Sequence, residues 1–312
     1  GGQEGGRPGR RSIPCTRACM LCLATLCRHL VLLALLLLHS PAFATDAMAD
    51  LSNKCVGFLG CGKISSAVCR GYAGASGASR PGKILVSQRS AEKSQALAAA
   101  YPGLVTIASN EEVVAQSDIV FIGLLPGVAR ELLPTLPFDD KKLVVSMMAA
   151  VDLAETLALV RVAPERLVRT VPLPAAANRS GPVLVHPPNQ ELEAVLRVVG
   201  TPVVCVQEAE MKPMVSLTGH ISSFFELMNA TQDFIVENGV DPVTARQFVT
   251  AFYSSCASGA EMSTEKLEDM AEEAATPGGL NEQSWRQLKT TQHFQLHKQS
   301  MQAILDRLQG KK

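Results

Sequence analysis

Short apolar runs and amphipathic stretches alternate along the chain from about residue 54 onward. The apolar runs are rich in Val, Ile and Leu and end at glycine, proline or polar residues, which predicts strands. The predicted strands are 55–59, 83–87, 104–108, 118–123, 142–147 and 167–171. Helices are expected between them at 63–73, 90–100, 126–133 and 151–160. Strands and helices that alternate at this spacing indicate βαβ units around a buried parallel sheet.

The pattern changes in the second half of the chain. Two more short strands, 182–186 and 202–206, are expected around a helix at 189–199. Beyond Gln207 the periodicity is helical only, and the predicted helices are 208–238, 241–260, 263–274 and 282–309. A helical half that follows a nucleotide-binding half often buries an apolar stripe against a second copy, so we expect a homodimer or a higher homo-oligomer.

The first 47 residues differ from the rest of the sequence. A basic Gly/Arg-rich start leads to an apolar run at 30–38 and then to Ala42-Phe43-Ala44. This arrangement is typical of a signal or targeting peptide, and the run is too short for a spanning helix. Met48 offers an alternative start. We therefore expect a cytoplasmic protein if translation begins at Met48, and otherwise a secretory-pathway or plastid-targeted one.

The charge balance bears on the kind of partner. Lys plus Arg and Asp plus Glu number 29 each, so the formal net charge is zero. This balance argues against nucleic-acid binding, which requires an excess of cations.

Five of the nine cysteines lie beyond the leader and form no C-x-x-C pair, which argues against a disulfide framework or a zinc site. His293 and His297 lack the glutamate of a metalloprotease helix, so no metal is expected.

A glycine-rich turn follows the first predicted strand. The segment 56–65 reads VGFLGCGKIS, and Gly60 and Gly62 take the first two places of a G-x-G-x-x-G/A fingerprint. One glycine permits the tight turn, the second lets N–H groups approach a pyrophosphate, and a small third residue lets helix pack on strand. A purely structural turn is the alternative. The residues predicted to contact a dinucleotide here are Gly57, Gly60, Gly62, Lys63, Ile64 and Ser65.

The end of the second strand bears on the type of cofactor. An NAD site places an acidic residue there, whereas this chain has Ser87, Arg89 and Ser90. A guanidinium and hydroxyls suit a 2′-phosphate, so NADPH is favoured over NADH. An ordinary solvated helix start is the alternative. Leu124 and Pro126 follow the fourth strand and are expected beside the nicotinamide half of the crevice.

The fold class that these features predict is α/β, with a Rossmann-type dinucleotide-binding domain followed by an all-α dimerisation domain. The expected boundaries are 1–47 for the leader, 48–207 for the NADP-binding domain and 208–312 for the helical domain. One strong break, Thr276-Pro277-Gly278-Gly279, interrupts the helical part and exposes N–H groups that suit a carboxylate or phosphate. A simple turn between helices is the alternative.

Several motifs together resemble the pyrroline-5-carboxylate reductase family over nearly all of residues 54 to 308. The turn at 56–64 looks like its G-F-I-G-x-G-x-M, and Ser87-Gln88-Arg89-Ser90 looks like its S-N-R-[ST]. The stretches 118–126 and 270–279 are similar to its A-D-V-[IV]-[IF]-L-A-V-K-P and L-x-x-x-V-[TS]-S-P-G-G-[TS]-T. The resemblance implies NADPH, a dimer, and reduction of 1-pyrroline-5-carboxylate to proline in proline biosynthesis.

Departures from the family pattern fall on the substrate side. Leu125 replaces a lysine, Leu173 replaces an asparagine, and Leu280-Asn281 replaces two hydroxyl residues after the glycines. Asn281 and Thr276, with Gly278 and Gly279, are expected to hold a substrate carboxylate. His220 lies outside the family pattern and is a candidate proton donor, with a buried, satisfied histidine as the alternative.

Three functions are compatible with these residues. The first is an NADPH-dependent reductase of 1-pyrroline-5-carboxylate. The second is a related reductase that acts on another imine or a ketone. The third is a non-catalytic NADP(H)-binding dimer.

Overall fold

The computed structural model describes residues 1–2 and 48–311. The chain divides into two compact units, Gly1–Ala47 and Met48–Lys312. The predicted targeting leader lies almost wholly outside the described residues. All that follows concerns the second unit.

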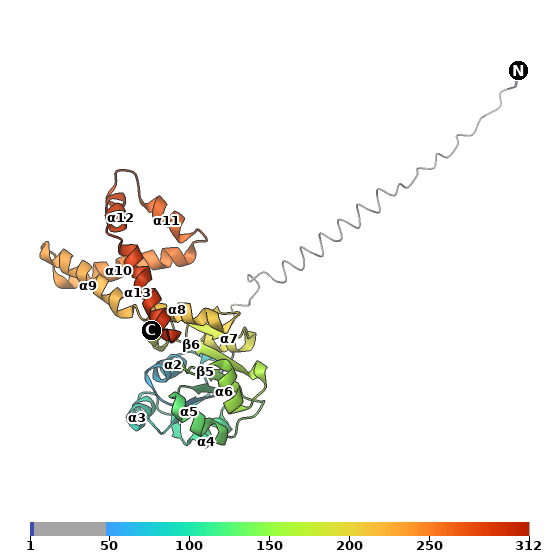
Figure 1. Ribbon diagram of the computed structural model, residues 1–312. Helices are drawn as coiled ribbons and strands as arrows, with labels where there is room; N and C mark the ends of the chain where they lie inside the picture. Colours follow the sequence, from blue (N-terminus) through green and yellow to red (C-terminus); the bar gives the residue numbers. More distant parts are fainter. Residues whose placement is uncertain (3–47, 312) are drawn as a thin grey trace. The chain divides into compact units, whose positions relative to one another are not determined.

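An eight-stranded sheet forms the centre of the unit, in the order β3-β2-β1-β4-β5-β6-β7-β8 (Figure 1). Every strand that the sequence predicts is present, with ends that agree to within two residues. The strands are Cys55–Leu59 (β1), Lys83–Ser87 (β2), Val105–Ala108 (β3), Ile119–Ile122 (β4), Leu143–Ser146 (β5), Leu167–Val171 (β6), Pro182–His186 (β7) and Thr201–Val204 (β8). The order reverses between β1 and β4, which creates a crevice at the carboxyl ends of these strands.

The parallel sheet predicted for the strands between residues 55 and 171 is confirmed, and the two later strands form an extension whose direction the sequence did not predict. Strands β1 to β6 are parallel, but β7 runs antiparallel to β6, and β8 is parallel to β7. A parallel crossover needs a dozen or more residues and usually a helix. The connection from β6 to β7 is shorter than that and contains only the 3-10 turn Pro174–Asn178 (η5), so the chain turns back beside β6.

Helices cover both faces of the sheet. One face packs against Lys63–Ala73 (α2), Ala91–Ala100 (α3) and Gln190–Leu196 (α7). The other packs against Asn110–Gln116 (α4), Pro126–Leu132 (α5) and Leu153–Val160 (α6). Helix α4 is absent from the predicted helices, although Ser109 and Glu112 form a reciprocal capping box at its start. Two apolar layers therefore enclose the sheet, as a doubly wound fold requires.

After strand β8, the regular elements of the described chain are all helical. They are Met211–Thr218 (α8), Ile221–Glu237 (α9), Pro242–Met262 (α10), Leu267–Ala274 (α11), Leu280–Thr290 (α12) and His293–Leu308 (α13). In Figure 1, α13 returns from the far helices to pack on α8. Among the described residues, none of the helices combines the length and apolarity needed to cross a membrane.

Two helices that the sequence predicts as continuous are each broken. The expected helix at 208–238 divides at Gly219 and His220, where α13 crosses closely: a Cβ on Gly219 would lie 2.7 Å from Cδ1 of Ile304. The expected helix at 282–309 divides at Gln292, whose φ of 57° is left-handed and interrupts the hydrogen-bond ladder. Both breaks allow α13 to fold back onto the α8–α9 junction.

Candidate functional site: a cofactor crevice beside an apolar cavity

The glycine turn after β1 has a backbone conformation that residues with a side chain rarely adopt. Gly60 has a φ of 87°, and a Cβ there would lie 2.5 Å from the carbonyl oxygen of Gly123. Its N–H donates to Oγ of Ser87 at 2.8 Å, which joins the turn to the end of β2. The turn therefore needs glycine for both backbone conformation and close approach.

Helix α2 begins directly after this turn and presents an open N-terminus. Gly62 is its N-cap, no side chain caps the helix, and no acidic residue lies in the first turn. A Cβ on Gly62 would meet nothing within 4 Å. Free N–H groups and the positive end of a helix dipole suit a pyrophosphate, so this part of the structure fits a dinucleotide.

A cavity of about 400 Å³ lies at this N-terminus. It brings together eight of the residues that the sequence predicts for the cofactor, from three strand ends. They are Gly60, Gly62, Lys63, Ile64, Ser65, Arg89, Ser90 and Leu124. The other residues of its wall are Cys61, Gly123, Leu125, Met147, Met148 and Ala149.

Three other predicted cofactor residues do not line this cavity. Gly57 is buried within β1, where an added Cβ would collide with Oγ of Ser117. Ser87 is fully buried, and its hydroxyl faces the Gly60 N–H. Pro126 is the first residue of α5. Their placement supports the walls of the crevice, and direct contact with a cofactor remains a prediction for them.

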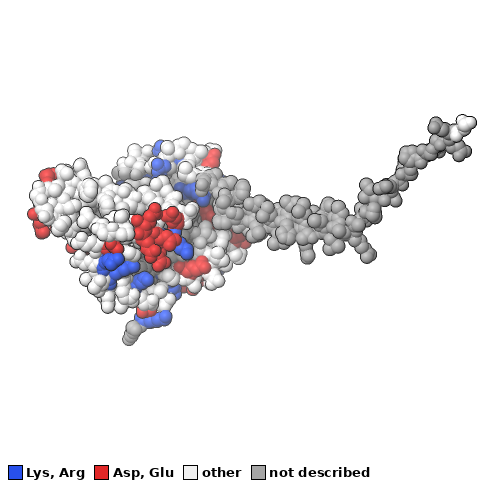
Figure 2. Space-filling view, turned by 90° about the horizontal axis from the view of Figure 1, so that it is seen from above, with Lys and Arg blue, Asp and Glu red and all other residues white. Residues whose placement is uncertain are grey.

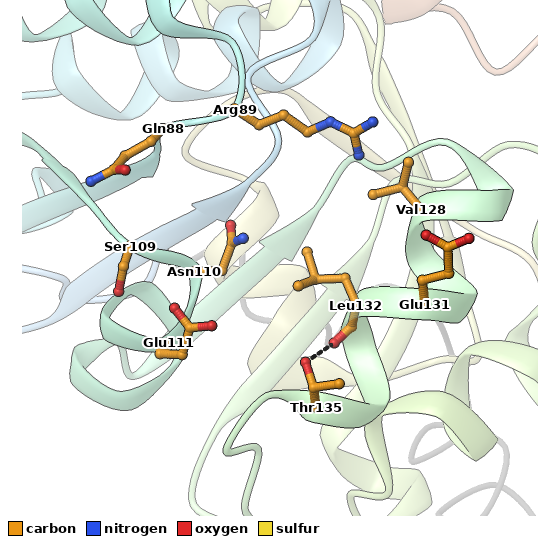
Figure 3. A pocket seen from close by; sticks show the side chains of 9 residues that line it. All are labelled: Gln88, Arg89, Ser109, Asn110, Glu111, Val128, Glu131, Leu132 and Thr135. Atoms are coloured by element: carbon orange, nitrogen blue, oxygen red, sulfur yellow. Dashed lines mark hydrogen bonds between the residues drawn. The ribbon is translucent and has the colours of Figure 1, made fainter.

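Arg89 also lines a second cavity of about 540 Å³, between the end of β2 and helix α5. Figure 3 shows its guanidinium extending towards Val128, while Gln88 points the other way. Glu111 on α4 and Glu131 on α5 also line this cavity. Arg89 has no ion-pair partner in the described part of the chain, so its charge is available to an anion such as a 2′-phosphate.

Cys61 lies between the two glycines of the turn and could be mistaken for a nucleophile. Burial raises the pKa of its thiol to about 11. A thiol with that pKa is protonated near neutral pH, and only the thiolate is nucleophilic. Cys61 is therefore part of the cavity wall and not a reactive group.

An ion pair between buried Arg169 and half-buried Glu208 lies at one edge of the cofactor cavity. Arg169 on β6 donates to Oε1 of Glu208 at 2.6 Å and to the carbonyl oxygen of Ala149 at 2.7 Å. The same Glu208 oxygen accepts from the N–H of Leu153 at 3.0 Å. This network connects the loop after β5, the start of α6 and the turn before α8. Sequence reasoning missed it because its members are far apart in the chain.

A third cavity, of about 620 Å³, lies where α8, α9 and α13 meet the loop after β6. Its lining is mostly apolar: Leu173, Ala175, Leu217, Ile221, Phe224, Phe225 and Leu227, with Ser223, His220, His293 and His297. His220 is 7% exposed, and its Nε2 is buried without a hydrogen-bond partner. The ring of His297 lies 4.6 Å from that of His220, centre to centre.

The histidines of this cavity do not form a metal site. Within residues 48–311 there is no group of three or more His, Cys, Asp or Glu side chains placed to hold an ion.

The loop between α11 and α12 and the first turn of α12 contain the residues predicted to hold a substrate carboxylate. Gly278 has a φ of 74°, but its N–H already donates to Oε2 of Glu282 at 2.7 Å. Asn281 donates to the carbonyl oxygen of Ala274 at 3.1 Å. Thr276, Gly278, Gly279 and Asn281 line neither the cofactor cavity nor the apolar cavity. The loop is therefore not brought to the crevice within one chain.

Glu282 is a residue that the sequence analysis missed. The Gly278 N–H lowers the pKa of its carboxyl, with a further contribution from Arg286. Its other oxygen pairs with Arg286 at 2.6 Å. Near this pair, Nζ of Lys289 lies 3.5 Å from the centre of the Trp285 ring. The turn before α12 thus already binds a carboxylate, that of Glu282.

Comparison with known proteins finds related sequences for both halves of the chain. Residues 55–150 match the family model described as NADP oxidoreductase coenzyme F420-dependent. Residues 208–311 match the model for pyrroline-5-carboxylate reductase dimerisation. The pyrroline-5-carboxylate reductase of Arabidopsis thaliana is 25% identical over 236 residues, which is 72% of this chain and 83% of that protein.

Solved structures of such reductases share the fold. The enzyme from Streptococcus pyogenes is 19% identical, with a TM-score of 0.67 over 83% of this chain and 99% of its own. The Plasmodium falciparum pyrroline carboxylate reductase, solved with NADP bound, is 16% identical, with a TM-score of 0.65 over 83% and 98% of the two chains. These two structures show the shared fold. The two family models, the relative from Arabidopsis thaliana and the glycine turn support membership of the pyrroline-5-carboxylate reductase family, and they indicate an NADP-dependent oxidoreductase that acts on a CH–NH group.

Proposed function

We propose that the protein uses NADPH to reduce a cyclic imine, with 1-pyrroline-5-carboxylate as the reference substrate and proline as its product. The observation that carries this proposal is the cofactor cavity at the uncapped start of α2, next to a second cavity at the end of β6. When bound, NADPH supplies a hydride to the imine carbon. Membership of the pyrroline-5-carboxylate reductase family supports this reaction class.

The cofactor residues divide by chemistry. Backbone N–H groups at Gly62, Lys63 and Ile64 would hold the pyrophosphate on the helix N-terminus. Arg89 and Ser90 would hold the 2′-phosphate, because both line the cavity and the guanidinium is unpaired. These assignments explain why the sequence has a basic residue where an NAD enzyme has an acidic one.

On the substrate side, His220 would act on the imine nitrogen. His220 lines the apolar cavity and its Nε2 is buried without a hydrogen-bond partner; in this proposal the ring would give a proton to the nitrogen as the C=N bond is reduced. Thr276, Gly278, Gly279 and Asn281 would anchor a carboxylate. A second copy of the chain would have to bring that loop to the crevice, since one copy does not.

Assembly as a homodimer would cover the apolar surface of α9 and α10. In Figure 2 most of the surface at the left, where Figure 1 has α9, is uncharged, with acidic side chains at its tip. Phe225, Phe234, Phe248 and Phe252 are between 53% and 66% exposed there. Exposed apolar surface of this extent marks an interface between proteins.

Replacing one of these phenylalanines should weaken the dimer. We expect Phe248→Glu to raise the dimer dissociation constant by about 100-fold. Each subunit loses the burial of one phenylalanine ring, and a twofold interface contains the position twice. Analytical ultracentrifugation of the full chain measures the shift. Gln247→Glu adds the same charge at the neighbouring exposed position and should leave the dimer intact. Equal effects of the two variants would contradict an interface at Phe248.

The reductase activity is tested by following NADPH absorbance in the full chain as 1-pyrroline-5-carboxylate is added. We expect rapid oxidation of NADPH, slowed at least 10-fold in Asn281→Ala if the loop anchors the substrate carboxylate. Asn229→Ala, an exposed change on α9, is the matched control. Tight binding of NADPH without oxidation would refute the proposal and leave a reductase of another imine or ketone, or a non-catalytic NADP(H)-binding dimer.

A further inference from the structure

The proposed cofactor contacts give the crevice a direction. Arg89 and Ser90, proposed for the 2′-phosphate, follow β2, and the pyrophosphate position at the start of α2 follows β1. Strand β4 lies on the other side of β1, and β5 lies next to β4. A dinucleotide that crosses this switch point has its adenosine half over β2 and its nicotinamide half over β4 and β5. Met147, Met148 and Ala149, which follow β5, therefore form the wall at the nicotinamide end of the cavity.

A single side chain holds the tip of that wall. Met148 and Val151 are buried, whereas Ala149 between them is exposed. The carbonyl oxygen of Ala149 accepts a hydrogen bond of 2.7 Å from the guanidinium of Arg169. Within residues 147–151, this is the one hydrogen bond that a side chain of the described chain supplies. The position of the wall at Ala149 thus depends on Arg169.

A residue of the helical half fixes the guanidinium in turn. Oε1 of Glu208 accepts from Arg169 at 2.6 Å and from the N–H of Leu153 at 3.0 Å. Leu153 is the first residue of α6, so the same carboxylate also holds the far end of the loop that contains Ala149. Glu208 begins the segment that matches the dimerisation model. The helical half therefore takes part in placing the nicotinamide end of the cavity.

Stability alone does not explain an arginine at this place. Its side chain is 10% exposed, and a charged pair there gains little over apolar side chains of similar volume, because both charges lose hydration. A planar guanidinium does fix geometry, since its N–H groups donate in set directions. Nη1 of Arg169 meets Glu208 and Nη2 meets Ala149, so one side chain sets the distance between the helical half and the cofactor wall.

We propose that Arg169 is a positioning residue for the nicotinamide half of NADPH, which acts through the carbonyl group of Ala149 while Glu208 holds its guanidinium. This inference rests on the cofactor orientation proposed above, and it is independent of which imine is reduced. The adenosine half would bind without this help, because Arg89 and Ser90 lie on the other side of the switch point, after β2.

Binding of the whole cofactor and of its adenosine half tests the inference. We measure the dissociation constants of NADPH and of adenosine 2′,5′-bisphosphate, which lacks the nicotinamide half, by calorimetry on the full chain. Arg169→Met should weaken NADPH binding about 10-fold or more and change that of the bisphosphate less than about twofold, because a displaced wall affects only the half that contacts it. Equal weakening of both ligands, or unchanged binding of NADPH, would overturn the inference.

A conservative variant provides a second measurement. Arg169→Lys keeps the cation but cannot make two bonds in fixed directions, so its NADPH affinity should lie between those of Arg169→Met and the unaltered protein. It also supplies the comparison of the two ligands if Arg169→Met does not fold. An NADPH affinity of Arg169→Lys equal to that of the unaltered protein would show that the second bond does not matter and would overturn the inference.

Two other arginines are the controls. Arg89→Met should weaken both ligands, because both contain the 2′-phosphate, and Arg166→Met, whose pair with Glu191 is exposed, should weaken neither. Unchanged binding of both ligands by Arg89→Met would refute the proposed cofactor orientation and, with it, this inference. If Arg89→Met behaves as expected and Arg169→Met does not, the inference alone fails. Failure of every imine to oxidise NADPH would count against the reductase alone.

Discussion

Gly62→Asp should weaken NADPH binding about 100-fold without destabilising the protein. The position is extended, N-caps α2 and has open space where the new side chain would begin. Aspartate is a good N-cap, so it would bond to the free N–H groups of α2 and preserve or raise the melting temperature. Its carboxylate would also occupy and repel the position that suits a pyrophosphate. Calorimetric titration of NADPH and a thermal melt measure the two effects.

Gly62→Asn is the control for this prediction. It has nearly the same shape and also caps helices, but it carries no charge. We expect its NADPH affinity to lie between those of the unaltered protein and Gly62→Asp. If both variants bound NADPH as tightly as the unaltered protein, the cofactor would not lie on the start of α2.

Arg169→Met should cost about 3 kcal/mol in the free energy of unfolding. The Arg169 side chain is 10% exposed and that of Glu208 is 28% exposed, so the substitution leaves a carboxylate without its cation in a poorly solvated place. The carbonyl oxygen of Ala149 also loses its donor. Denaturation of the full chain by urea, followed by circular dichroism, measures the loss.

A second arginine of the same region provides the comparison. Arg166 pairs with Glu191 at 3.3 Å, and the Glu191 side chain is 62% exposed. Pairs that reach into water contribute little, so Arg166→Met should cost less than about 1 kcal/mol. Equal losses for the two variants would mean that the burial of the Arg169 pair does not determine its contribution.

The sequence was most informative where structure depends on neighbours in the chain. The apolar runs predicted all eight strands, because a buried strand needs a continuous apolar segment. The glycine turn predicted the start of α2 and most of the cofactor cavity, since Gly60 and Gly62 act through local backbone conformation. Both are properties of ten or fewer consecutive residues.

The sequence was least informative where distant segments meet. The reversal of β7 depends on how β6 and β7 pair, and each strand alone has the same pattern in either direction. The Arg169–Glu208 pair joins residues far apart in the chain. The breaks at Gly219 and Gln292 follow from the packing of α13 on α8, which no local propensity encodes.

Trp285 is a natural fluorescent probe next to the α11–α12 loop. The chain contains one tryptophan, so all indole fluorescence arises from the first turns of α12. The ammonium of Lys289 lies over that indole, and Glu282, the carboxylate on the loop, is three residues before it. Emission is sensitive to such nearby charges. An event that moves Glu282 off the loop would therefore be visible in unlabelled protein, by excitation of a single natural chromophore.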